Sequence, residues 1–109
     1  MKIISEILIS KSQFRDLVLD TIATSYLGGF QFANLCETVA FNAVKRGYVE
    51  NPYGINDTTF IFDMSIKDKE KLRVLVNDLM KEDILKIGNA YGKAWPYLGL
   101  TDSYNNLPR

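Results

Sequence analysis

Hydrophobic residues recur at helical spacing in three stretches of the chain, and each stretch predicts a helix. The first helix begins after Ser10, because Ser10 and Gln13 have the S-x-x-Q spacing of a capping box. We expect it to end at the glycine pair 28–29, which disfavours helical backbone. The second helix is expected from about residue 31 to residue 46, with Gly47 as the left-handed residue after it.

The third helix follows the clearest strand pattern in the sequence. From Thr58 to Met64, large apolar residues alternate with other side chains, which favours a strand. Ser65 is then expected to cap a helix, with Asp68 as an acidic capping partner three residues further on. The apolar positions of this helix repeat on one side and are expected to form its core face: Leu72, Leu75, Val76, Leu79 and Met80.

The sequence after the third helix predicts a two-stranded hairpin. Ile84–Ile87 and Trp95–Leu100 are its expected arms, and residues 88–92 supply a tip that tolerates positive φ angles. Pro96 has no backbone N–H, so we expect the second arm at a sheet edge. These elements predict one α+β domain over residues 1–109, with three or four helices, a small antiparallel sheet and a C-terminal β-hairpin.

Composition and charge narrow the range of partners. With 47% hydrophobic and 24% charged residues, the chain has an ordinary globular composition. Its 13 basic and 13 acidic residues give a formal net charge of zero, so total charge does not indicate a nucleic-acid partner. The charge is uneven, because residues 67–93 hold seven Lys or Arg against five Asp or Glu. The third helix and the hairpin are therefore slightly basic.

Side chains for catalysis or metal binding are scarce. The sequence has no histidine, which removes His-based acid–base chemistry and His metal ligands. The glycine pair 28–29 lacks the Lys-Ser/Thr of a phosphate-binding loop. The single cysteine, Cys36, lies on an apolar helix face, so we expect it buried and inert in a reducing cytoplasm. We therefore expect no enzyme, no cofactor, no metal site and no membrane-spanning segment.

The stretch from residue 66 to residue 102 resembles the second half of a winged helix-turn-helix domain; it contains the run DKEKLRVLVNDLMKEDILKIGNAYGKAWPYLGLTD. It is similar to small transcription regulators of the MarR-like and PadR-like group. In that group a recognition helix ends in a Leu-x-x-x-Gly-Leu/Ile-Leu step and leads into a two-stranded wing. Residues 79–85 match the step, with Asp83 where glycine is usual, and Leu100-Thr101 matches the end of the wing.

The resemblance implies a DNA-binding transcriptional regulator with a recognition helix at about residues 66–82 and a wing at about residues 84–100. Its partner would be double-stranded DNA, with lysines on phosphates and Arg or Asn side chains on base edges. The implied DNA-binding residues are Lys67, Lys69, Lys71, Arg73, Asn77, Tyr91 and Lys93. Among them, Arg73 and Asn77 are the expected base readers.

Other interpretations of the same residues stay open. The alternating charges of residues 67–73 also fit a solvated helix end, and the aromatic residues around Trp95 also fit the base of their own hairpin. The chain would then be a non-enzymatic protein-binding adaptor or inhibitor on a winged-helix scaffold. In addition, residues 47–64 separate the second and third helices, so either the helix-turn-helix carries an insertion or its helices pair differently.

The first ten residues fit a helix or a strand, because they combine a helical apolar stripe with β-branched side chains. The first 26 residues are more apolar than a small wing domain needs for its own core. We therefore expect a homodimer that forms through this N-terminal region. The residues expected to be partly buried between the two chains are Ile3, Ile4, Ile7 and Leu8.

Overall fold

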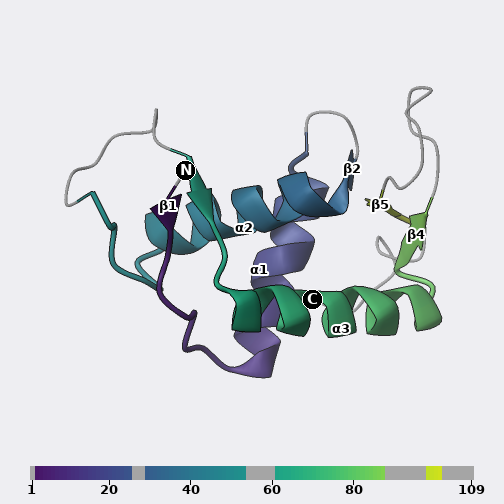
Figure 1. Cartoon of the computed structure of the whole chain (residues 1–109). Helices are drawn as coiled ribbons and strands as arrows, with labels where there is room; N and C mark the ends of the chain where they lie inside the picture. The colour runs from purple at the N-terminus through teal and green to yellow at the C-terminus, as the bar shows by residue number, and fades with distance from the viewer. Residues whose placement is uncertain (1, 26–28, 54–60, 88–97, 102–109) are drawn as a thin grey trace.

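Three helices and five short strands make up the described part of the chain, residues 2–25, 29–53, 61–87 and 98–101 of this computed structural model (Figure 1). The helices are α1 (Lys11–Ala23), α2 (Phe32–Lys45) and α3 (Ile66–Lys81). The strands are β1 (Lys2–Ile3), β2 (Gly29–Phe30), β3 (Phe62–Asp63), β4 (Leu85–Ile87) and β5 (Leu98–Leu100). The fold is α+β, as the sequence predicts.

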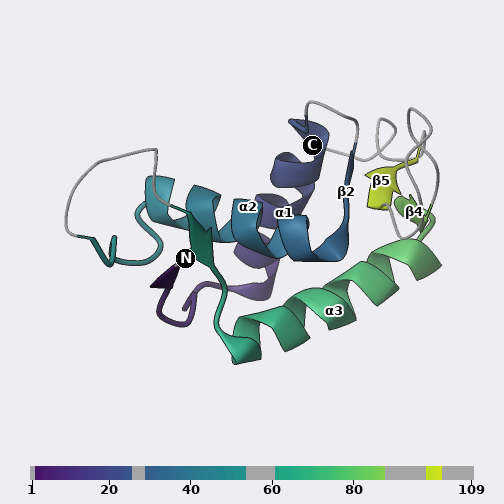
Figure 2. The same cartoon turned by 45° about the horizontal axis from the view of Figure 1, so that its top comes forward.

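Within the described ranges the strands form two small sheets. β1 pairs parallel with β3, whereas β5 lies between β2 and β4 and is antiparallel to both. The two sheets lie toward opposite ends of α2, as Figures 1 and 2 show. β4 and β5 lie within the ranges expected for the two arms and pair with each other, while the hairpin that would connect them stays a prediction. Residues 88–97, which include the expected tip and Pro96, lie outside the described residues.

Both serine-capped helices begin where the sequence predicts. The hydroxyl of Ser10 accepts from the N–H of Gln13 at 3.1 Å, and the Gln13 side chain accepts from the N–H of Ser10 at 3.0 Å. The hydroxyl of Ser65 accepts from the N–H of Asp68 at 3.2 Å. Each cap satisfies a backbone N–H that has no partner inside its helix.

The end of α1 corrects the expectation that this helix runs to the glycine pair 28–29. The helix ends at Ala23, and Gly29 belongs to β2. The hydroxyl of Thr24 donates to the carbonyl oxygen of Asp20 at 2.9 Å. A threonine side chain therefore helps to satisfy the carbonyl oxygens of the last turn of α1.

Left-handed residues end the other two helices. Gly47 follows α2 with a φ of 75°, as the sequence predicts, and Asp83 follows α3 with a φ of 60°. Beyond α3, the N–H of Ile84 donates to the carbonyl oxygen of Leu79 at 2.9 Å, which is the wrap-around bond of a Schellman motif. Asp83 is thus an aspartate in a backbone conformation that glycine adopts more easily, at the position where the resemblance expects glycine.

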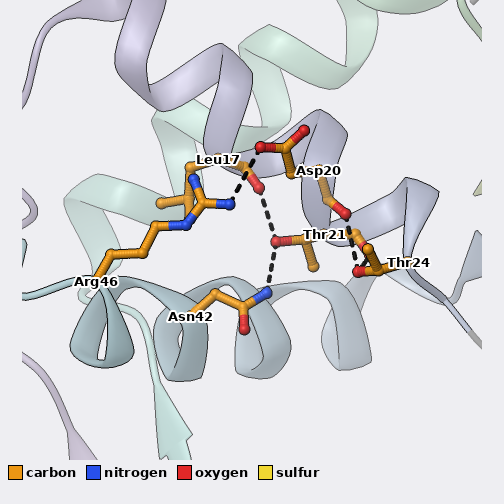
Figure 3. Close-up of polar contacts among 6 residues, drawn as sticks. All are labelled: Leu17, Asp20, Thr21, Thr24, Asn42 and Arg46. Carbon is orange, nitrogen blue, oxygen red and sulfur yellow. Dashed lines mark hydrogen bonds and ion pairs between the residues drawn. The ribbon is translucent and has the colours of Figure 1, made fainter.

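Polar side chains lock α1 against α2 (Figure 3). The amide nitrogen of Asn42 donates to the hydroxyl of Thr21 at 2.9 Å, and that hydroxyl donates to the carbonyl oxygen of Leu17 at 2.7 Å. Arg46 binds the carboxylate of Asp20 at 3.1 Å on the exposed side of the same contact. Thr21 is fully buried and fully hydrogen-bonded, so this contact leaves no unpaired polar atom at its centre.

The core draws buried side chains from the three helices, from β3, β4 and β5 and from the N-terminal segment, and it includes residues that we expected at a dimer interface. Ile4 and Ile7 are buried inside their own chain at 3% and 1% exposure, which corrects the expectation that they lie between chains. In the expected strand 58–64, Phe62 and Met64 are buried, while residues 54–60 lie outside the described ranges. No helix in the described ranges is long and apolar enough to cross a membrane.

Candidate nucleic-acid interface

The outer face of α3 carries a mixture of charges rather than a basic stripe. Leu72, Val76 and Leu79 are buried on the inner side of the helix, and Leu75 is half-buried beside them. The exposed side chains of the helix are Ile66, Lys67, Glu70, Lys71, Arg73, Val74, Asn77, Asp78 and Lys81. This set has four basic, two acidic and two large apolar residues, so any anion bound here would meet acidic groups as well.

Arg73 is held in place by two neighbours. Its guanidinium carbon lies 5.2 Å from the ring centroid of Phe32, at the start of α2, and the guanidinium binds the carboxylate of Glu70 one turn back. The side chain is nevertheless more than half exposed. The cation–π contact with Phe32 therefore places the guanidinium where α2 begins beside α3, and its exposed part can still form hydrogen bonds.

Lys69 lies nearer the core than the sequence suggests. Its ammonium binds the carboxylate of Asp63, in β3, at 2.8 Å, and this hydrogen bond raises the pKa of Lys69 above its usual value. The pair lies beside Cys36, which is buried as expected, and burial raises the pKa of that thiol to about 11. Lys69 therefore joins α3 to β3, and a phosphate would have to compete with Asp63 for it.

Lys71 binds the N-terminal segment of its own chain. Its ammonium lies 3.0 Å from the carboxylate of Glu6 and 3.8 Å from that of Asp68. The hydrogen bond from Lys71 lowers the pKa of Glu6, and the same bond raises the pKa of Lys71. Lys71 is about half exposed and Glu6 one third exposed, so water screens this attraction.

Asp68 has a second role that the sequence analysis missed. One carboxylate oxygen accepts from the backbone N–H of Ile7 at 2.9 Å, and the whole side chain is buried. The other oxygen, Oδ1, has no hydrogen-bond partner, although Lys71 lies near it. A sequence signal was present, because Asp68 occupies a position on the same helical stripe as Leu72 and Leu79. The negative charge of Asp68 is therefore buried and does not lie on the outer face of α3.

The remaining expected site residues divide into two groups. Lys67 and Asn77 are exposed, and none of the ion pairs among the described residues includes Lys67, Lys81 or Lys86 of β4. Tyr91 and Lys93 lie outside the described residues. The exposed candidates for DNA binding that remain on α3 are Lys67, Arg73 and Asn77.

Among the described residues, no group of three or more His, Cys, Asp or Glu side chains is placed to hold a metal ion. Compared with known proteins, the sequence matches no family model, and neither a curated protein nor a solved structure matches it significantly. The functional argument therefore depends on the surface of α3 and on the order of the elements around it.

Proposed function

We propose that this chain is a winged-helix domain that binds double-stranded DNA and regulates transcription in the cytoplasm. α3 would be the recognition helix, and β4 and β5 would be the arms of the wing. The observation that carries the proposal is the order of three elements. The chain leaves α3, passes through the left-handed residue Asp83 and enters the antiparallel pair β4–β5. Asp83 stands where the resemblance expects glycine, and it has the left-handed backbone that glycine adopts easily.

The position of β2 supports the same proposal. This strand precedes α2 in sequence and pairs with β5, so it ties the β4–β5 pair to the helices. A wing that contacts a DNA backbone has to be held at a fixed angle to the recognition helix, and a third strand supplies that restraint. The long connection between α2 and α3 is then an insertion in the helix-turn-helix, and it contains β3.

The ion pairs on α3 are compatible with DNA binding but reduce its expected strength. An exposed ion pair contributes only about 0–1 kcal/mol to stability, so a phosphate can replace its carboxylate at small cost. Lys67 needs no such exchange, whereas Lys71 and Arg73 would first leave Glu6 and Glu70. We therefore expect weak duplex binding with a shallow salt dependence, because few phosphates are neutralised.

Charge reversal at Lys67 tests the proposal. Lys67→Glu should weaken binding to all duplex sequences alike and reduce the salt slope by about 1, because one phosphate contact is lost. The fold should survive, since an acidic residue in the first turn of α3 suits the helix dipole. Lys45→Glu is the matched control, because Lys45 is an exposed cation at the far end of α2. Equal affinity of the wild type and Lys67→Glu for duplex, measured by a salt-gradient shift assay, would refute the proposed DNA face.

A second candidate function follows from a different observation. Val74 lies exposed at 60% on the outer face of α3, beside Glu70 and Asp78, and the chain has no net charge. Apolar and acidic residues at this place suit a protein partner better than a phosphate backbone. If the wild type does not bind duplex at low salt, a protein-binding adaptor or inhibitor becomes the better proposal.

A further inference from the structure

A groove separates the N-terminal segment and the start of α1 from one flank of α3. Its volume is about 450 Å³. The apolar part of its lining comes from both sides of the groove: Ile7, Ile9, Phe14, Val74 and Leu75. The charged side chains around it are Lys11, Glu70, Lys71 and Asp78. An apolar hollow with charged edges is the usual form of a binding site, either for a ligand or for a protein surface.

Ion pairs fix the shape of this groove. Lys71, on its edge, binds Glu6 of the N-terminal segment at 3.0 Å. One turn beyond the groove on both helices, Arg15 of α1 binds Glu82 after α3 through two hydrogen bonds, at 3.0 and 3.2 Å. The two sides are thus linked by salt bridges while the space between them stays open, so the groove is part of the folded chain.

Apolar side chains project beside the hollow. Leu8, between the lining residues Ile7 and Ile9, is 78% exposed, and Val74 on the opposite side is 60% exposed. The N-terminal segment therefore carries an exposed leucine next in sequence to two residues that line the apolar hollow. A surface with both features can bind a second copy of itself across a two-fold axis, with each leucine in the other copy's hollow.

The groove also has charges of opposite sign on its two sides, and these can pair between two copies of the chain. Lys11 and Asp78 line opposite sides of it, and no ion pair among the described residues includes either of them. A two-fold axis through the groove can bring Lys11 of each copy to Asp78 of the other. The chain has a formal net charge of zero, so two copies do not repel each other at long range.

We propose that this groove is the interface of a symmetric homodimer, in which Leu8 of each copy enters the other's groove and Lys11 of each copy pairs with Asp78 of the other. The dimer does not depend on DNA binding. Positions 67, 71, 74 and 78 lie on the groove side of α3, whereas Arg73 and Asn77 lie on its other flank, because successive helical residues are rotated by about 100°. Variants at Arg73 and Asn77 can therefore test DNA binding without changing the groove side.

The first test uses sedimentation velocity over a range from micromolar to hundreds of micromolar protein. The wild type should show a concentration-dependent dimer, and Leu8→Asp should weaken self-association by about tenfold or more, since a carboxylate would enter an apolar groove. Ile66→Asp is the matched control, because Ile66 is 79% exposed and does not line the groove. A wild type that stays monomeric throughout, or an unchanged Leu8→Asp dimer, overturns the proposal.

A charge exchange tests the orientation of the two copies. Lys11→Glu and Asp78→Lys should each weaken the dimer, because like charges would face each other, and the double variant should restore it to within about threefold. Neither change should unfold the chain, since an acidic residue at the start of α1 and a basic one in the last turn of α3 both suit the helix dipoles. Failure of the double variant to restore the dimer rejects the two-fold arrangement.

Discussion

α1 lies against α2 and against α3, and side chains fill the two contacts to different extents. Against α2 it is packed closed, with buried Leu17 and the hydrogen-bonded Thr21 at the centre (Figure 3). Against α3 it is joined by the ion pair of Arg15 with Glu82, and a groove remains between the two helices. The closed contact resembles the interior of a domain, whereas the open one keeps apolar side chains available on the surface. The α1–α2 contact is thus closed to partners, whereas the proposed second copy would bind where α1 and α3 leave apolar side chains exposed.

The largest effect on stability should come from truncating side chains that are fully buried in the core. Leu17→Ala and Leu72→Ala should each lower the free energy of unfolding by about 2–5 kcal/mol, because each leaves a cavity in the core. Leu75→Ala should cost less than either, since Leu75 is half-buried and lines the groove. Urea unfolding of the three variants measures this order. A Leu75→Ala variant as unstable as Leu17→Ala would mean that the groove is closed in solution.

Asp68 should come next, because it fixes the N-terminal segment to α3. Asp68→Ala leaves the backbone N–H of Ile7 buried without its acceptor, which should cost about 1–3 kcal/mol. Amide exchange at Ile7 should accelerate more than exchange at Leu17, which lies in the closed contact. Equal protection of Ile7 in the wild type and the variant would show that another group replaces the carboxylate.

Asn42 provides the corresponding test within the closed contact. Asn42→Ala removes the hydrogen bond to Thr21, while Thr21 keeps its bond to the carbonyl oxygen of Leu17. We expect a loss of about 0.5–1.5 kcal/mol, because only one neutral hydrogen bond disappears and its partner stays satisfied. Thermal unfolding of Asn42→Ala next to Asp68→Ala measures the difference. The prediction fails if Asn42→Ala is the less stable of the two.

The ion pair between Arg15 and Glu82 should contribute less still. Both side chains are partly exposed, at 31% and 47%, so a double-mutant cycle should give a coupling of about 0.2–1 kcal/mol. High salt should reduce that coupling further. A coupling that does not change with salt would indicate that packing of the Arg15 stem, rather than charge, joins the two helices.

Glu6 should have the smallest effect and a defined pH dependence. Lys71 lowers the pKa of Glu6 in the folded chain below its ordinary value of 4.5, so the pair stabilises the fold above that pH. The contribution is lost as the pH falls through the lowered folded pKa. The difference in urea midpoint between the wild type and Glu6→Gln should therefore be present at pH 7 and should shrink toward pH 3. An increase toward low pH would contradict this assignment.

Much of the fold could be predicted because its signals are local in sequence. The caps at Ser10 and Ser65 and the left-handed Gly47 act within a few residues, so spacing alone indicates them. The end of α1 was predicted too late, because the glycine pair 28–29 is a strong helix-ending signal and the hydroxyl of Thr24 is a weaker one. The parallel pairing of β1 with β3 was missed, because no local pattern links strands 60 residues apart.

The candidate site was harder to predict, since its charges depend on distant partners. The sequence suggests that Lys69 and Lys71 are free cations, but they bind Asp63 and Glu6 in the fold. Lys67 and Asn77 are exposed as the helical spacing predicts. The buried carboxylate of Asp68 depends on Ile7, 61 residues away, which helical spacing alone cannot indicate. Helical spacing thus predicts on which face of a helix a residue lies, but not which residues of distant segments it contacts there.

The pairing of Lys2 with Phe62 also determines the order in which the fold can assemble. Joining these residues closes a loop of about 60 residues, and the entropy cost of closing a loop grows with its length. Contacts inside α1 and α2 are local and can form first, so the N-terminal segment should attach late. The segment from residue 2 to residue 10 is synthesised before β3 and Asp68, and it cannot dock until both have been made. The groove between this segment and α3 is therefore one of the last surfaces to form.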